Sequence, residues 1–277
     1  MIVSRANLRV SFFGGGTDYA QWYNTHGGAI LGGAINKYVY VCLHDGNISA
    51  FWDLPNKSGL ASSSAYTVAL LRSCSNLTNL EISKMATILE IEKTGGMVGS
   101  QDQFLCAMGG FHHLKFSEHG IKDFPITQDI VTPLQDYLML FDTNQYRRNG
   151  DIIPSQLQEM TAHEDIYKHM AEMPGQGVTL LKEKDYQRFG ELLGVAWELK
   201  KQVAPKATTP QIDSIYEKAI KAGAIGGKLL GGGGGGFIVF VVEPDKQIAV
   251  KQALSGLDNH PFKFENEGTK VVYHDNR

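Results

Sequence analysis

The sequence is poor in cysteine, in charge of one sign and in long apolar runs, and each shortage excludes a class of protein. Its three cysteines, Cys42, Cys74 and Cys106, are odd in number and lie singly in apolar segments, which predicts reduced, buried thiols and no disulfide framework. The net charge of −3 offers nucleic acid no basic surface. No stretch reaches the roughly 18 apolar residues of a membrane span, and the N-terminus lacks a signal-peptide pattern. We therefore expect a cytoplasmic protein with small-molecule partners, and no nucleic acid or membrane.

Glycine is the residue that the chain has in excess. Its 31 glycines among 277 residues are about 11% of the chain, against a usual share of about 7%. They gather in clusters, at 14–16, at 59, at 95–99 and in an unbroken run at 231–236. Each cluster adjoins an apolar segment, so these glycines predict close approaches of the backbone, and not disordered tracts.

Hydrophobic patterns predict strands in the first part of the chain and helices in the later part. Residues 8–13 and 34–43 read as strands, an Asp-Gly turn at 45–46 predicts that 48–52 returns as a hairpin, and 137–141 and 237–242 read as strands buried on both faces. Helical periodicity appears at 66–73, 81–92, 155–170, 185–200 and 212–222. This order predicts an α+β protein of two lobes, with domains at 1–132 and 133–277.

A loop of glycine and serine at 58–64 runs directly into the apolar helix predicted at 66–73. Unpaired N–H groups and the helix dipole favour an anion at such a helix start, so the loop is a candidate phosphate site. An ordinary serine-capped helix start is the alternative. A nucleotide P-loop is excluded because Gly227 and Lys228 are followed by Leu229, and the glycine run precedes a strand, which is the wrong order for a dinucleotide motif.

Four motifs in order along the chain resemble those of the GHMP kinase superfamily, whose members include galactokinase, homoserine kinase, mevalonate kinase and phosphomevalonate kinase. The motifs are ANLRVSFFGGGTDY (6–19), DLPNKSGLASSS (53–64), VGSQDQ (98–103) and LLGGGGGGF (229–237). Together with HGGAI (26–30) and GGF (109–111), they look most like the heptose 7-phosphate kinase group of sugar 1-kinases. The resemblance implies a two-lobed fold with a ribosomal-S5-like N-terminal domain and a ferredoxin-like C-terminal domain.

The resemblance also implies a kinase that uses ATP and Mg²⁺, and it assigns roles to matching positions. Asp102 matches the catalytic base, and Arg9, in the matching first motif, is the second implied catalytic residue. The loop implied to bind the ATP phosphates is Gly59, Leu60, Ala61, Ser62, Ser63 and Ser64. The implied Mg²⁺ ligands are Ser63 and Glu92, with Glu90 as the alternative carboxylate. The residues implied to lie against the acceptor sugar are Gly15, Gly16, Thr17, Asp18, Gly233 and Gly234.

The implied reaction is phosphorylation of the anomeric hydroxyl of a heptose 7-phosphate. Galactokinases carry Glu-His where this chain has Gly15 and Gly16, so the chain has room for a larger or phosphorylated sugar. Two alternatives stay open: a kinase of a fucose, galactose or mannose derivative, and a non-catalytic protein on the same fold that binds sugar and nucleotide. A homodimer also stays open.

Three further segments are less decisive. Residues 44–52 are much shorter than the matching segment of the family, which indicates either a reduced hairpin or omitted residues. His112 and His113 lie on a predicted strand and face opposite sides, so they do not predict a metal site. Arg147 and Arg148 suit either a substrate phosphate or a solvated surface.

Overall fold

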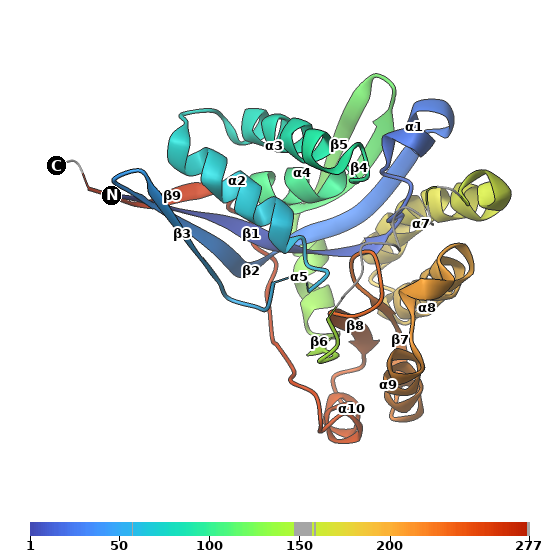
Figure 1. The fold of residues 1–277 in the computed structure, drawn as a ribbon. Helices are drawn as coiled ribbons and strands as arrows, with labels where there is room; N and C mark the ends of the chain where they lie inside the picture. The colour runs from blue at the N-terminus through green and yellow to red at the C-terminus, as the bar shows by residue number, and fades with distance from the viewer. Residues whose placement is uncertain (57, 147–156, 158, 276–277) are drawn as a thin grey trace.

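The larger of two sheets is built on a hairpin of two long strands, β1 (Ile2–Phe13) and β2 (Gly28–His44). The computed structural model describes residues 1–56, 58–146, 157 and 159–275. The strand order is β5-β4-β2-β1-β9, and β3 pairs with the part of β2 that lies beyond β4. These further strands are β3 (Asn47–Trp52), β4 (Phe111–Ser117), β5 (Gly120–Ile126) and β9 (Lys270–His274). The end of the chain thus returns to lie beside its beginning (Figure 1).

The smaller sheet has the order β6-β8-β7 and belongs to the second lobe. Its strands are β6 (Leu138–Asp142), β7 (Ala224–Leu229) and β8 (Phe237–Val242). All six residues of β8 are buried, and alternate residues point into two different core clusters. The prediction of a strand buried on both faces is therefore confirmed.

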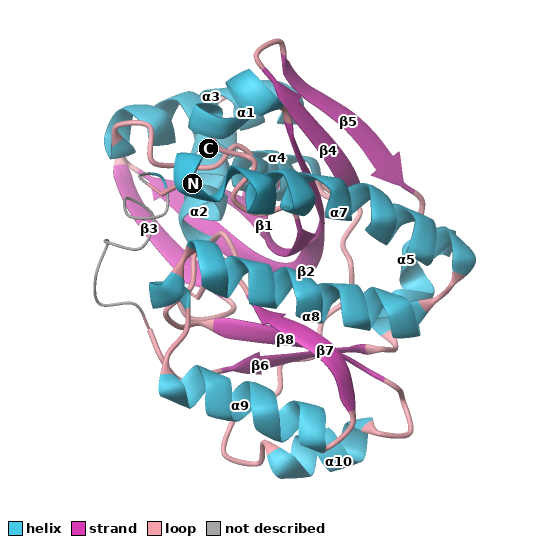
Figure 2. Ribbon diagram, turned by 90° about the vertical axis from the view of Figure 1, so that its right-hand side faces the viewer, coloured by secondary structure: helices cyan, strands magenta, loops and turns pink. Residues whose placement is uncertain are grey.

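Helices cover the outer face of each sheet and fill the space between the two. α2 and α4 pack against β1 and β2, while α7 and α8 lie between the sheets, and α9 and α10 lie beyond the smaller one (Figure 2). The helices of the first lobe are α1 (Ala20–His26), α2 (Ser62–Cys74), α3 (Asn79–Thr94), α4 (Gln101–Met108) and α5 (Gln128–Gln135). Those of the second lobe are α7 (Glu164–Glu183), α8 (Tyr186–Val203), α9 (Pro210–Lys221) and α10 (Gln247–Ala253), with 3-10 turns at Thr161–His163 and Pro205–Ala207.

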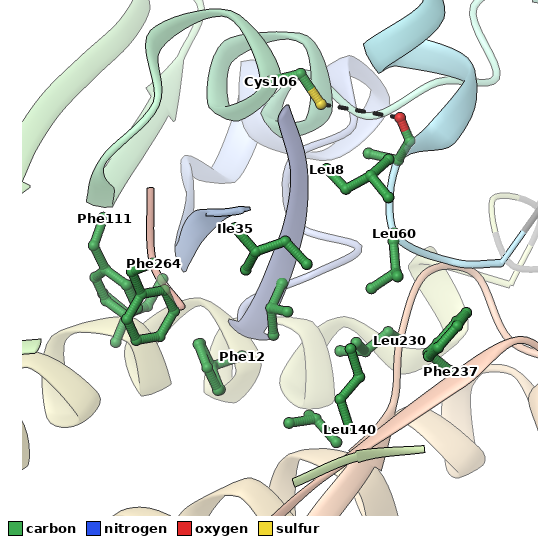
Figure 3. Packing of buried hydrophobic residues seen from close by; sticks show 14 of the residues in the cluster. Leu8, Phe12, Ile35, Leu60, Cys106, Phe111, Leu140, Leu230, Phe237 and Phe264 are labelled. Carbon is green, nitrogen blue, oxygen red and sulfur yellow. Dashed lines mark hydrogen bonds between the residues drawn. The ribbon is translucent and has the colours of Figure 1, made fainter. Parts of the chain in front are cut away.

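One hydrophobic core cluster runs through both lobes. The Phe12 ring of β1 lies 5.8 Å from the Phe111 ring and 5.5 Å from the Phe189 ring of α8, measured between centroids. Figure 3 shows Leu60 beside Leu230, which links the glycine-serine loop to the second lobe through apolar contact. Because buried side chains in contact resist separation, the loop is held by the packing of both lobes.

Most of the predicted elements are confirmed, including the hairpin, whose turn residues Asp45 and Gly46 both have positive φ. The fold is α+β, as predicted, and the structure shows that both sheets are antiparallel. The cysteine prediction is wrong in part: Cys106 is buried, but Cys74, the last residue of α2, is exposed and Cys42 is half-buried. The helix predicted at 155–170 begins as α7 only at Glu164, after the 3-10 turn at Thr161–His163, while residues 155, 156 and 158, like Arg147 and Arg148, lie outside the described residues. In the part of the chain that the structure describes, no helix is long and apolar enough to span a membrane.

Candidate active site

The glycine-serine loop, residues 58–64 (the phosphate loop), delivers the N-terminus of α2 to an open cavity. Gly59 and Ala61 both have positive φ, +82° and +63°, so the backbone turns sharply on each side of Leu60. Leu60 is fully buried and anchors the loop in the core, where its carbonyl oxygen accepts a hydrogen bond from the backbone N–H of Arg9. Ala61 then caps α2 without a side-chain capping hydrogen bond, and the start of such a helix favours an anion.

The run Gly231–Gly236 (the glycine hairpin) connects β7 to β8 and packs against the phosphate loop. The N–H of Phe237 donates to the carbonyl oxygen of Ser58 over 2.9 Å. A Cβ atom on Gly236 would lie 2.2 Å from that same oxygen, and one on Gly231 would lie 2.5 Å from the Cα of Gly59. The predicted close passage of the glycine run along the phosphate loop is confirmed, and side chains are sterically excluded there.

Arg9 of β1 and Asp102 of α4 form a two-pronged ion pair at the floor of the cavity. Arg9 Nε lies 2.8 Å from Oδ1 of Asp102, and Nη2 lies 2.9 Å from Oδ2. The third guanidinium nitrogen, Nη1, donates to the carbonyl oxygen of Gly59 over 2.8 Å. The Arg9 side chain is 4% exposed, whereas that of Asp102 is 25% exposed, so the carboxylate is the member of the pair that a ligand reaches. The pair ties the catalytic candidate directly to the phosphate loop.

Glu90 of α3, and not Glu92, is the carboxylate beside the phosphate loop. Its Oε2 accepts hydrogen bonds from the Ser64 hydroxyl at 2.8 Å and from Gln103 Nε2 at 2.5 Å, and its Oε1 accepts one from Thr67 at 3.0 Å. Burial raises the pKa of Glu90 above its ordinary value.

The assignment of Glu92 as a metal ligand needs correction. Glu92 is exposed and lies outside the cavity. Two residues along a helix rotate by about 200°, so positions 90 and 92 face opposite sides of α3. Glu90, the alternative, is the residue that the fold brings to the site.

Asp18, in the turn after β1, is buried on the other side of the cavity floor. It accepts hydrogen bonds from the N–H of Gly16 at 3.0 Å and from Gln101 Nε2 at 2.9 Å. Burial, and next the negative charge of Asp102, raise the pKa of Asp18. Gln101 in turn accepts a hydrogen bond from Ser11 at 2.7 Å. A continuous polar network therefore fixes the start of α4, where Asp102 lies.

The cavity between these groups has a volume of about 470 Å³. Of the predicted residues, those that line it are Arg9, Gly15, Gly16, Asp18, Gly59, Ala61, Ser62, Ser63, Ser64 and Asp102. Besides Glu92, four predicted residues do not line it: Leu60 is in the core, the Thr17 hydroxyl donates to the carbonyl oxygens of Gly14 and Ala29, and Gly233 and Gly234 pack on Ala207. These four residues therefore do not form the wall of this cavity, and nothing in its lining supports the contacts with phosphate or sugar that the resemblance implies for them.

Sequence reasoning missed several lining residues, among them Ser11, Lys93, Gln101, Lys200 and Lys228. The sequence does point to Gln101, because this residue directly precedes Asp102 in the third motif. For Lys228 the sequence offers only an incomplete P-loop pattern, which predicts no role for this residue. Its Nζ donates to the carbonyl oxygen of Phe12 over 3.0 Å, and burial followed by the charge of Arg9 lowers its pKa to about 8.

Comparison with known proteins finds kinases among those similar to this chain. The chain is 27% identical to the D-glycero-alpha-D-manno-heptose 7-phosphate kinase of Campylobacter jejuni over 81% of this chain and 70% of that protein. It is also 27% identical to the mevalonate kinase of Pyrococcus abyssi over 81% of this chain and 68% of that protein. A crystal structure of a D-glycero-D-manno-heptose 1-phosphate kinase from Bacteroides thetaiotaomicron shares the fold, with a TM-score of 0.79 at 24% identity over 99% of this chain and 100% of that one.

Two family models match the chain, one on each side of the cavity. The model of the GHMP kinase N-terminal domain matches residues 31–110, which include the phosphate loop and Asp102. The model described as GHMP kinases C terminal matches residues 178–258, which include the glycine hairpin. Because the two matches together span more than half of the chain, it belongs to the GHMP kinases, phosphotransferases whose acceptor is a hydroxyl group.

Proposed function

We propose that this sugar kinase transfers the γ-phosphoryl group of ATP to the anomeric hydroxyl of a heptose 7-phosphate, with Mg²⁺ as cofactor. The observation that carries the proposal is the joining of the phosphate loop to Asp102 through a single residue, Arg9. Phosphoryl transfer needs positioning and charge neutralisation more than covalent chemistry, and this arrangement supplies both. The similarity to a heptose 7-phosphate kinase supports the choice of acceptor.

Asp102 is the proposed base for the attacking hydroxyl. Each of its oxygens accepts one hydrogen bond from Arg9, and a carboxylate oxygen has a second lone pair that accepts the substrate proton. The guanidinium fixes the orientation of the carboxylate, which matters because a misplaced base loses most of its effect. In this proposal Arg9 also offsets negative charge that develops near Gly59 during transfer.

The residues around Ser63 and Glu90 fit a magnesium ion. Mg²⁺ prefers oxygen ligands and is commonly held by one or two protein groups together with substrate phosphates. Ser63 lines the cavity, and Glu90 is a buried carboxylate whose Oε1 accepts only one hydrogen bond among the described residues. A cation there offsets the cost of burying that charge. When bound, it neutralises phosphate charge, while Ser64, Thr67 and Gln103 orient the carboxylate.

The acceptor is proposed to bind between Asp18 and the stretch Gly15–Gly16. All three residues line the cavity, and neither glycine places a side chain in it. Asp18 is held by Gly16 and Gln101 and offers oxygen atoms to sugar hydroxyls.

The division of the chain into domains at residues 132 and 133 also stays a proposal. In it, the first domain contains the acceptor site and the second contributes the glycine hairpin.

A coupled assay of ADP release tests the proposal. Purified protein is given Mg²⁺-ATP and D-glycero-D-manno-heptose 7-phosphate, and in parallel galactose, fucose and mannose. We expect turnover with the heptose phosphate and little with the neutral sugars, and a product whose anomeric carbon carries the new phosphate by ³¹P and ¹H NMR. Turnover confined to a neutral sugar would replace the proposed acceptor, and ATP binding without turnover would favour the non-catalytic alternative.

A further inference from the structure

Lys228, on β7 of the second lobe, is a buried cation that the proposed reaction leaves without a role. It is 4% exposed and lines the cavity. Within the described residues its ammonium donates one hydrogen bond, to the carbonyl oxygen of Phe12, and makes no ion pair with a carboxylate. An ammonium has three N–H donors, so two remain. Burying an unpaired charge is costly, and such a group is kept where a ligand completes its bonding.

Lys228 lies apart from the phosphate loop, which is the part of the site proposed to bind ATP. Along β1, Arg9 is bonded to Gly59 and Leu60 of the phosphate loop, whereas Lys228 is bonded three residues further on, at Phe12. Three residues of a strand span about 10 Å. The other buried cavity lysine, Lys200, donates instead to the carbonyl oxygen of Gly231, beside the phosphate loop.

The glycines after β1 leave Lys228 uncovered. A Cβ atom on Gly15 would lie 3.9 Å from the Lys228 Nζ, which is ordinary contact distance. A side chain at position 15 would therefore contact the ammonium, and glycine leaves that space open. Arg9 differs from Lys228 because its charge is already paired with the Asp102 carboxylate through two hydrogen bonds, and a third guanidinium N–H donates to Gly59.

We propose that Lys228 is a specificity-determining residue that binds the phosphate group carried by the acceptor sugar, and not the phosphoryl group transferred from ATP. The inference rests on the proposed function. An acceptor with its hydroxyl at Asp102 and its phosphate at Lys228 spans the cavity floor from the phosphate loop toward Gly15. Its phosphate takes the two remaining N–H donors and neutralises the buried charge.

The pKa of Lys228 supports this role. Burial and the positive charge of Arg9 lower it, and Asp18 raises it, with a net value of about 8. A bound phosphate adds negative charge next to the ammonium and favours its protonated form. Binding of a sugar phosphate near pH 8 is therefore expected to take up protons, whereas binding of the neutral sugar is not.

The test compares Lys228→Met with the wild-type protein on one sugar in two forms, with and without its phosphate. We expect kcat/KM for the sugar phosphate to fall about 100-fold, as for other buried charges that lose their partner. The value for the unphosphorylated sugar should stay nearly unchanged, and Lys228→Arg should restore part of the loss. Lys221→Met, an exposed lysine at the end of α9, is the control.

If Lys228→Met does not fold, as judged by its urea midpoint, a measurement on the wild-type protein keeps the test decisive. Calorimetric titrations near pH 8, in buffers of different ionisation enthalpy, should show proton uptake when the sugar phosphate binds and none when the unphosphorylated sugar binds; equal proton uptake for both sugars would overturn the assignment. An equal fall with both forms of the sugar would overturn the assignment, since it would place Lys228 on the transferred group or in the structural framework. A wild-type protein that turns over no sugar phosphate at all would instead refute the proposed function.

Discussion

Replacing Glu90 by Gln should remove most of the activity, whereas the same change at Glu92 should not. Glu90 is buried beside the phosphate loop, and Glu92 is exposed on the opposite side of α3. E90Q removes one negative charge at the proposed Mg²⁺ site without changing the size of the side chain. Loss of one group that fixes charge in a phosphoryl-transfer site costs about 100- to 1,000-fold in turnover, or about 3 to 4 kcal/mol. E92Q, a surface change, should stay within about twofold of wild type.

The structure also predicts that E90Q folds. The hydroxyls of Ser64 and Thr67 serve either as donors or as acceptors, so they adapt to the new amide. Gln103 Oε1 has no hydrogen-bond partner among the described residues, so a rotated Gln103 amide accepts a hydrogen bond from the new NH₂ group. We expect a loss of less than about 1.5 kcal/mol in the free energy of unfolding, the size of one ordinary hydrogen bond.

The pH dependence of stability should change as well. Burial raises the pKa of Glu90 in the folded protein above 4.5, so its contribution to stability is full below pH 4.5 and is lost as the pH rises through the raised pKa. E90Q has no carboxyl group at this position, so its stability should not fall in this way as the pH rises. Urea midpoints of both proteins at several pH values measure this difference, and initial rates at several concentrations of free Mg²⁺ measure the functional effect. If E90Q kept wild-type rates and Mg²⁺ dependence, or if E92Q were the more damaged variant, the proposed metal site would be wrong.

Three further predictions concern the same cavity. Asp102→Asn should lower kcat by at least about 100-fold, the share of a general base, while the Kd for ATP in a calorimetric titration changes little; an unchanged kcat would refute the role of Asp102. Gly59→Ala should lower the free energy of unfolding by about 1 to 3 kcal/mol, measured with urea, because φ is +82° and the new Cβ would lie 2.5 Å from the Leu230 carbonyl oxygen; a neutral result would mean that the loop moves freely. The KM for the acceptor phosphate should rise above pH 8 as Lys228 loses its proton, and a KM profile that is flat between pH 7 and 9 would contradict this.

The parts of the site that could be predicted from the sequence are those fixed by local backbone geometry. A loop that must turn twice within three residues and then start a helix needs glycine or small residues, so Gly59 and the serines after it are recognisable. The same holds for the glycine hairpin, where any Cβ at Gly231 or Gly236 would meet the phosphate loop. Arg9 lies on the strand that leads into Gly14, and Asp102 lies on the helix that follows Gly99, so both are close in sequence to such segments, and the structure joins them.

The choice between Glu90 and Glu92 could not be made in this way. Both residues lie on one predicted helix, and their distance from Asp102 along the chain includes the turn at Gly95 and Gly96, whose path is unknown before the fold is known. The amphipathic pattern of α3 gives little help, because its outward face carries apolar side chains such as Ile88 and Leu89, both more than 40% exposed. Only the packing of α3 against α2 and α4 decides which carboxylate is buried.

The burial of the charged Lys228 side chain could not be predicted from the sequence either. The ordinary prediction for a lysine is a solvated side chain, and only the strand order β6-β8-β7, with α8 packed on it, buries this one next to β1. The cavity floor consequently has two kinds of charge. Arg9 and Asp102 neutralise one another through two short hydrogen bonds and present an ionised carboxylate, which suits a reacting hydroxyl. Among the described residues Lys228 makes no such pair, so we propose that the charge that completes it arrives with the substrate, and a neutral sugar brings none.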